Sequence, residues 1–132
     1  MKSLKIAVIG GGFFGSSIAI ELKEKFHNFK IDLFEKIKNQ VPAAIFPELN
    51  SKLACPALVT ALASRLNTAV SIDNGIMHML ALSNIPMIVL FGPTNSKKFA
   101  PKNKFTHILD SKILHKSKNI NSIEVDEVLS LI

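Results

Sequence analysis

Three short aliphatic runs, each followed at once by a turn that contains glycine, constrain this 132-residue chain more than any other feature. The runs are KIAVI at Lys5–Ile9, AVSI at Ala69–Ile72 and MIVLF at Met87–Phe91. Runs of this length are typical of strands buried on both faces of a parallel sheet. KIDLF at Lys30–Phe34 and the segment Phe105–Leu109 bring the set to about five strands. We therefore expect an α/β, three-layer, Rossmann-like domain with a mostly parallel sheet.

Segments with helical spacing separate the expected strands. They lie at Ser16–Phe26, Ala57–Leu66, Ile76–Leu82 and Ile123–Ile132. Gly92–Pro101, with two prolines, is expected to be a loop, and Val41–Phe46 is left open between a short strand and a loop. We expect one domain over residues 1–132, with a dinucleotide-binding-like βαβ unit at 1–40 and a second portion at 56–132.

Glycines follow the first expected strand in the pattern Gly10-x-Gly12-x-x-Gly15. Gly10 permits a tight turn, Gly12 lets the backbone approach a pyrophosphate, and Gly15 lets the helix pack close to the sheet. Glu35 ends the second strand, where its carboxylate can accept hydrogen bonds from a ribose diol. The pattern predicts a dinucleotide site, and a βαβ unit that folds without a cofactor is the alternative.

The segment that carries this pattern, IAVIGGGFFGSSIAIELKEKFHNFKIDLFEK, resembles the opening of flavin-dependent oxidoreductases of the amino-acid-oxidase type. The resemblance covers residues 4–36 and implies FAD held by Gly10, Gly12, Gly15 and Glu35. Nothing later in the chain resembles the rest of such an enzyme.

A second polar turn, Asp73-Asn74-Gly75, follows the strand AVSI, and His78 lies one turn into the next helix. Open α/β sheets bind ligands at the carboxyl ends of their strands. Backbone N–H groups at Asn74 and Gly75 can cradle a diphosphate, and His78 can hydrogen-bond a phosphate or sugar oxygen. The structural alternatives are that Asp73 and Asn74 only cap the helix and that His78 has no ligand.

The strand MIVLF delivers a further loop, Gly92-Pro93-Thr94, to the same sheet edge. Lys97 follows it and can screen phosphate charge. Two neighbouring loops at one edge predict a cleft for an anionic ligand.

The stretch TAVSIDNGIMHMLALSNIPMIVLFGPTNSKKFAP, with INSIEVDEVLSLI as a closing helix, resembles the C-terminal part of glycosyltransferase family 9, the heptosyltransferases of lipopolysaccharide synthesis. The resemblance covers residues 58–131 and implies half of the two-domain GT-B fold, binding a nucleotide sugar such as ADP-heptose. It implies Asp73 on the sugar hydroxyls, Asn74, Gly75 and His78 on the diphosphate, and Thr94 in the same cleft. The family usually has Thr or Ser where Asn74 stands, and its acceptor-binding domain, which supplies the catalytic base, has no counterpart here.

The formal net charge of +6 favours anionic partners, and lysines gather at Lys97–Lys104 and Lys112–Lys118. No aromatic residues alternate with them as in RNA-reading surfaces, so we expect no nucleic-acid partner. Histidine spacing fits no metal site, and the single Cys55 forms no internal disulfide. No run approaches the roughly 20 apolar residues of a transmembrane helix. We expect a cytoplasmic protein that can lie at the surface of the inner membrane.

The expected function is binding of a nucleoside-diphosphate sugar for glycosyl transfer to a lipopolysaccharide-type acceptor. The transfer requires no cofactor, and no catalytic residue is assigned because no motif positions a base. Two alternatives stay open: an FAD-binding oxidoreductase fragment and a non-catalytic or relic nucleotide-binding module. Because two unrelated resemblances meet at about residue 45, a hybrid or a fragment is also open.

Overall fold

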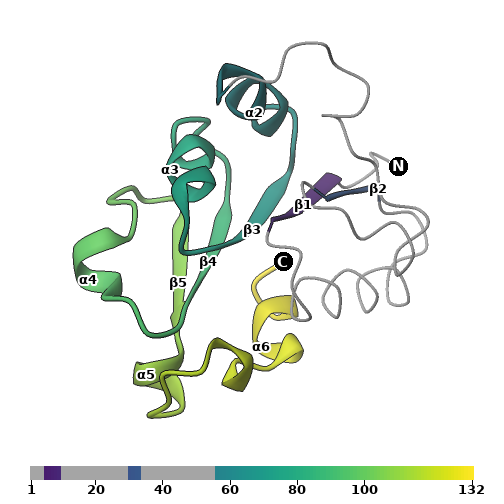
Figure 1. The fold of residues 1–132 in the computed structure, drawn as a ribbon. Helices are drawn as coiled ribbons and strands as arrows, with labels where there is room; N and C mark the ends of the chain where they lie inside the picture. Colours follow the sequence, from purple (N-terminus) through teal and green to yellow (C-terminus); the bar gives the residue numbers. More distant parts are fainter. Residues whose placement is uncertain (1–4, 10–29, 34–55) are drawn as a thin grey trace.

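One parallel sheet organises the chain in a computed structural model, which describes residues 5–9, 30–33 and 56–132 (Figure 1). Its five strands have the spatial order β2-β1-β3-β4-β5, and every neighbouring pair is parallel. The predicted α/β fold with a mostly parallel sheet of about five strands is confirmed. The strands are β1 (Lys5–Ile9), β2 (Lys30–Leu33), β3 (Thr68–Ile72), β4 (Met87–Phe91) and β5 (Thr106–Asp110).

The strand order places a topological switch point between β1 and β3. The chain passes from β1 outward to β2 and then returns to the other side of β1 to form β3. In open α/β sheets ligands bind in the crevice outside the carboxyl ends of the strands at such a point. The register sets Ile9 beside Ser71 and Ile72 beside Leu90, so β1, β3 and β4 end at a common edge.

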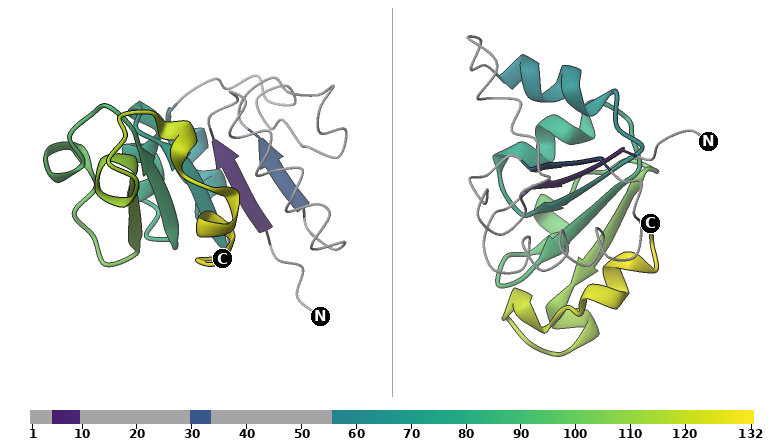
Figure 2. Two further views of the ribbon diagram at one scale, coloured as in Figure 1. Left: turned by 90° about the horizontal axis from the view of Figure 1, so that it is seen from below. Right: turned by 90° about the vertical axis from the view of Figure 1, so that its right-hand side faces the viewer.

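Helices cover both faces of this sheet. In the right-hand view of Figure 2, α2 and α3 lie on one side of the strands while α5 and α6 lie on the other. The described helices are α2 (Pro56–Ala63), α3 (Gly75–Ala81), α4 (Ser96–Phe99), α5 (Ser111–Leu114), the 3-10 turn η2 (Ile120–Ser122) and α6 (Val125–Leu129). Among the described residues, none of these helices has the length and apolar character to cross a membrane.

The core under α2 and α3 follows from side-chain alternation along the strands. Met87, Val89 and Phe91 of β4 pack in one buried cluster with Met77 and Leu80 of α3. The residues between them on β4 point to the opposite face and are equally buried. Burial of β4 on both faces explains its unbroken aliphatic run.

Two helices end differently from the expectation. The helix predicted at Ala57–Leu66 stops at Ala63, and its last turn tightens: the N–H of Arg65 donates to Leu62, three positions back, at 3.0 Å. The helix predicted at Ile123–Ile132 is shorter at both ends. Glu124 forms a capping box with Glu127, which fixes the start of α6 at Val125.

The loop predicted at Gly92–Pro101 is wrong in its middle, where α4 forms between the two prolines. The Asn95 side chain accepts a hydrogen bond from the N–H of Lys98 at 3.3 Å and caps this single turn. The last strand is shifted by one residue, so that Asp110 ends it. Several expectations lie outside the described residues: Gly10, Gly12, Gly15, Glu35, Cys55, the helix at Ser16–Phe26 and the segment Val41–Phe46. The division into sub-segments 1–40 and 56–132 stays a prediction.

Candidate functional site

The turn between β3 and α3 places the carboxylate of Asp73 at the carboxyl edge of the sheet. The backbone N–H of Asp73 donates to the carbonyl of Leu90 at 3.2 Å, which ties the turn to β4. The Asp73 side chain is half-buried, and no described residue donates a hydrogen bond to its carboxylate. A carboxylate with this surrounding can accept hydrogen bonds from hydroxyl groups of a ligand.

Asn74 caps α3 with its side chain. Its Oδ1 accepts hydrogen bonds from the N–H groups of Ile76 at 3.0 Å and Met77 at 3.1 Å. These two N–H groups are therefore occupied within the protein, as the capping alternative expected. Gly75 precedes them and is exposed. Beyond its chain neighbours and its own helix backbone, no atom of the described residues lies within 4 Å of the position that a Cβ would take, so those residues leave the start of α3 open.

His78 lies on the exposed surface of α3, one turn beyond Gly75. No described residue forms a hydrogen bond with its ring. Its imidazole is exposed and has no competing hydrogen-bond partner among the described residues.

The neighbouring loop after β4 packs against the C-terminal part of the chain. Gly92 is buried, and a Cβ there would lie 3.1 Å from the Cβ of Ile120 and 3.2 Å from the carbonyl oxygen of Lys118. This close packing against Ile120 and Lys118 accounts for a glycine at position 92 without a ligand. Pro93 and Thr94 are exposed, so the loop presents these two residues to solvent.

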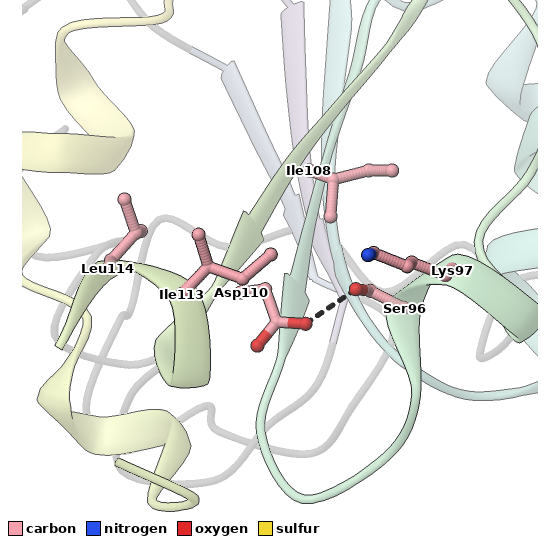
Figure 3. Close-up of a pocket in the computed structure, with 6 residues that line it drawn as sticks. All are labelled: Ser96, Lys97, Ile108, Asp110, Ile113 and Leu114. Carbon is pink, nitrogen blue, oxygen red and sulfur yellow. Dashed lines mark hydrogen bonds between the residues drawn. The ribbon is translucent and has the colours of Figure 1, made fainter. Parts of the chain in front are cut away.

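A buried polar network lies at the carboxyl end of β5 (Figure 3). The Ser96 hydroxyl donates to Oδ2 of Asp110 at 2.5 Å, and both side chains are buried. Oδ1 of Asp110 accepts from the N–H of Lys112 at 2.9 Å. The Lys112 ammonium lies 3.7 Å from Oδ2 of Asp110 and donates to the carbonyl of Thr94. The network thus links α4, α5 and the loop after β4 through the carboxylate of Asp110.

Burial alone would raise the pKa of Asp110. The hydrogen bonds from Ser96 and from the Lys112 backbone, together with the Lys112 charge, outweigh burial and hold that pKa below its ordinary value. Asp110 is therefore an anion at neutral pH.

Two adjoining pockets open beside this network, with volumes of about 240 and about 370 Å³. Lys97 lines both, and Pro93 lines the larger one. Neither pocket includes Asp73 or His78. The predicted site residues therefore fall into two neighbouring groups on one sheet edge, the turn Asp73–His78 and the loop that runs to Lys97.

Sequence reasoning missed Ser96, Asp110 and Lys112. The expected last strand ends at Leu109, one residue before Asp110. The available signal was the pair Asp110-Ser111 directly after an apolar run, since Asp at the end of a strand commonly caps the next helix.

Two family models match the chain. The model for glycosyltransferase family 9 (heptosyltransferase) matches residues 27–126. A model for an NAD(P)-binding Rossmann-like domain matches residues 8–39. No curated protein gives a significant match.

Solved structures of this fold include three transferases. The glycosyltransferase family 9 protein of Veillonella parvula DSM 2008 superposes with a TM-score of 0.72 at 15% identity, over 98% of this chain and 45% of its own. Heptosyltransferase WaaC of E. coli with ADP gives 0.74 at 14% identity, over 97% and 42%. E. coli ADP-heptose LPS heptosyltransferase II gives 0.63 at 16% identity, over 98% and 46%. At these identities the likeness establishes the fold, and the chain spans less than half the length of each structure.

Proposed function

The chain belongs to glycosyltransferase family 9, and on this premise we propose that its β3–α3 turn binds a nucleoside-diphosphate sugar of the ADP-heptose type. The observation that carries the proposal is the half-buried Asp73 carboxylate, which no described residue hydrogen-bonds, at the carboxyl ends of parallel strands. Of the structures with the same fold, WaaC contains ADP and heptosyltransferase II is named for ADP-heptose. Both facts support this ligand class.

Asp73 accepts hydrogen bonds from sugar hydroxyls in this proposal. The carboxylate has no competing donor among the described residues, so a diol can bind it without displacing a contact to any of them. Its backbone is fixed by the bond to Leu90, which limits the conformational entropy lost when the ligand binds.

The diphosphate lies over the start of α3. Gly75 provides open space there, His78 donates from the next turn, and Thr94 and Lys97 approach from the neighbouring loop. Asn74 acts indirectly, because its side-chain oxygen already holds the first turn of α3 in place. Where the family usually has the hydroxyl of Thr or Ser, this chain has the amide of Asn74, which caps α3.

In glycosyl transfer an acceptor hydroxyl attacks the anomeric carbon while the nucleoside diphosphate departs. Positive groups such as Lys97 stabilise the charge that develops on the departing diphosphate. We propose that a lipopolysaccharide-type acceptor receives the sugar at the cytoplasmic surface of the membrane, without a cofactor. No described residue is assigned as the base, so the proposal for this chain rests on donor binding.

Isothermal titration of the full chain with ADP and with an ADP-sugar tests the proposal. Asp73→Ala should weaken binding of the ADP-sugar and spare ADP, whereas His78→Ala should weaken both. Asp126→Ala and His107→Ala are the matched controls, since they remove an exposed carboxylate and an exposed imidazole from other elements. Equal affinities for all four variants would show that the β3–α3 turn is not the site.

A second candidate is a dinucleotide at the glycine pattern Gly10-x-Gly12-x-x-Gly15. The match of residues 8–39 to an NAD(P)-binding domain and the switch point beside β1 both favour it. Purification with a yellow chromophore, or titration with FAD and NADH, distinguishes it. Gly12→Val should abolish binding of these dinucleotides and leave ADP-sugar affinity unchanged.

A further inference from the structure

The positive charge of the chain is concentrated around the edge strand β5. We call residues 95–118, which comprise α4, β5, α5 and their loops, the β5 rim. The β5 rim contains seven lysines and a single acidic residue, so it carries the whole formal charge of +6. The lysines are Lys97, Lys98, Lys102, Lys104, Lys112, Lys116 and Lys118. All except the half-buried Lys112 are exposed, and the one acid, Asp110, is buried in the network with Ser96.

The same surface exposes apolar side chains. Of the six exposed large hydrophobic residues among the described ones, four belong to the β5 rim: Phe99, Ile108, Ile113 and Leu114. Ile113 is 68% exposed. Exposed aliphatic groups scattered singly need no explanation, but a cluster among lysines marks an interaction surface.

Three of the apolar groups and one of the lysines, Lys97, meet at the pocket of about 240 Å³ between α4 and α5. Ile108, Ile113 and Leu114 line it, and Lys97 extends along its side (Figure 3). A lysine stem can pack along such an apolar wall while the ammonium group reaches outward. The arrangement suits a partner that offers both negative charge and hydrocarbon.

We propose that the β5 rim docks on an anionic lipid surface, with its lysines at the headgroups and Ile113 and Leu114 entering the interface. Clustered lysines next to exposed aliphatic residues are the physical requirement for such binding. A nucleic acid fits less well. The rings of Phe99 and Phe105 each have a lysine ammonium 5.1 Å from the centroid, so that face is not free to stack on a base. Of the proposed nucleotide-site residues only Lys97 belongs to the rim, and Asp73 and His78 lie outside it, so variants at the other rim residues test lipid docking separately from nucleotide binding.

Co-sedimentation with vesicles tests the docking surface. The full chain should bind phosphatidylcholine vesicles that contain phosphatidylglycerol, and should not bind pure phosphatidylcholine vesicles. Replacing Lys98, Lys116 and Lys118 by Gln should lower the partition coefficient on the order of 100-fold, from about fivefold for each lysine. Raising the salt to about 1 M should release the protein, because the Debye length falls to about 3 Å.

Matched single variants separate the rim from general surface effects. Lys118→Gln should weaken vesicle binding, and Arg65→Gln, which removes one exposed charge after α2, should not. Ile113→Ser should weaken it, and Leu82→Ser, which alters an equally exposed residue after α3, should not. Equal binding to neutral and anionic vesicles would overturn the proposal. So would a triple variant that binds like the wild type, or tighter binding to an oligonucleotide than to anionic vesicles.

Discussion

The β3–α3 turn and the carboxyl end of β5 lie on the same sheet edge and use an aspartate in opposite ways. Asp73 is half-buried and has no hydrogen-bond donor among the described residues. Asp110 is buried and holds Ser96 and Lys112. Asp73 directly follows β3 and Asp110 is the last residue of β5, so the position at a strand's carboxyl end alone does not decide the role.

The difference lies in what surrounds each carboxylate. Desolvation of a buried charge is costly unless hydrogen bonds compensate it, and Asp110 receives them from two helices. Asp73 keeps part of its hydration and can exchange it for ligand hydroxyls. We therefore assign folding stability to Asp110 and propose ligand binding for Asp73.

Asp110→Ala is expected to have the largest effect. It leaves the buried Ser96 hydroxyl without its acceptor and removes the cap of α5, which should lower the free energy of unfolding by about 3 kcal/mol. Urea unfolding followed by circular dichroism measures this loss. Asp110→Asn, which keeps an acceptor oxygen, should lose less. Wild-type stability of the Ala variant would contradict the structural role.

The stability from Asp110 should depend on pH. Its folded pKa lies below the ordinary value, so the contribution is complete above the unfolded pKa of about 4 and is lost as the pH falls through the folded value. The difference in unfolding free energy between wild type and Asp110→Asn should therefore shrink as the pH falls from 7 to below 4. A constant difference across this range would show that the ionised carboxylate contributes nothing.

Asp73→Ala should give the reverse pattern. The ADP-sugar affinity should fall by about 30-fold, or about 2 kcal/mol, because the protein loses a charged group that accepts hydrogen bonds from the sugar hydroxyls. The free energy of unfolding should change by less than about 0.5 kcal/mol, since no described donor loses its partner. A variant that unfolds easily but binds normally would reverse the assignment of the two aspartates.

Gly92→Ala tests how tightly the loop after β4 rests on the C-terminal segment. The added methyl group would lie 3.1 Å from the Cβ of Ile120, so the segment must shift, at a cost of about 1 kcal/mol. Gly75→Ala is the matched control, because the described residues place no atom beyond its own helix and chain neighbours within 4 Å of the added group. Equal thermal stability of the two variants would show that Gly92 does not pack tightly against Ile120.

The smallest effect is expected at the surface pair of His115 and Glu127, whose Nε2 and Oε2 atoms are 2.8 Å apart. The backbone N–H of Glu124 and the His115 side chain lower the pKa of Glu127. His115→Ala should nevertheless cost at most about 0.5 kcal/mol, because solvent screens an exposed pair. Thermal unfolding at neutral pH measures it, and a loss above 1 kcal/mol would show that the pair is not screened.

The strands could be predicted from the sequence because their signal is local. Met87–Phe91 was predicted with its observed bounds, since a strand buried on both faces must be apolar throughout. The helices after β4 and β5 were not predicted. They are single turns held by Asn95 and Asp110 side chains, and such caps give no periodic pattern.

The site was predictable in part for the same reason. Asp73, Gly75 and His78 follow a strand at fixed spacing, so a local pattern places them at the sheet edge. The contact between Ser96 and Asp110 joins residues on different elements, and only the tertiary structure brings them together. Whether Gly92 serves a ligand or a neighbouring segment likewise depends on Ile120, which lies far along the chain.

An amide NMR titration of the full chain with an ADP-sugar tests the central claim most directly. Shifts that centre on Asp73–His78 and extend to Gly92 and Thr94, with Asp110 and Ser111 unmoved, are the predicted result. Shifts centred on Asp110 and Lys112 instead, or no shifts at ligand concentrations that saturate nucleotide-sugar enzymes, would contradict it.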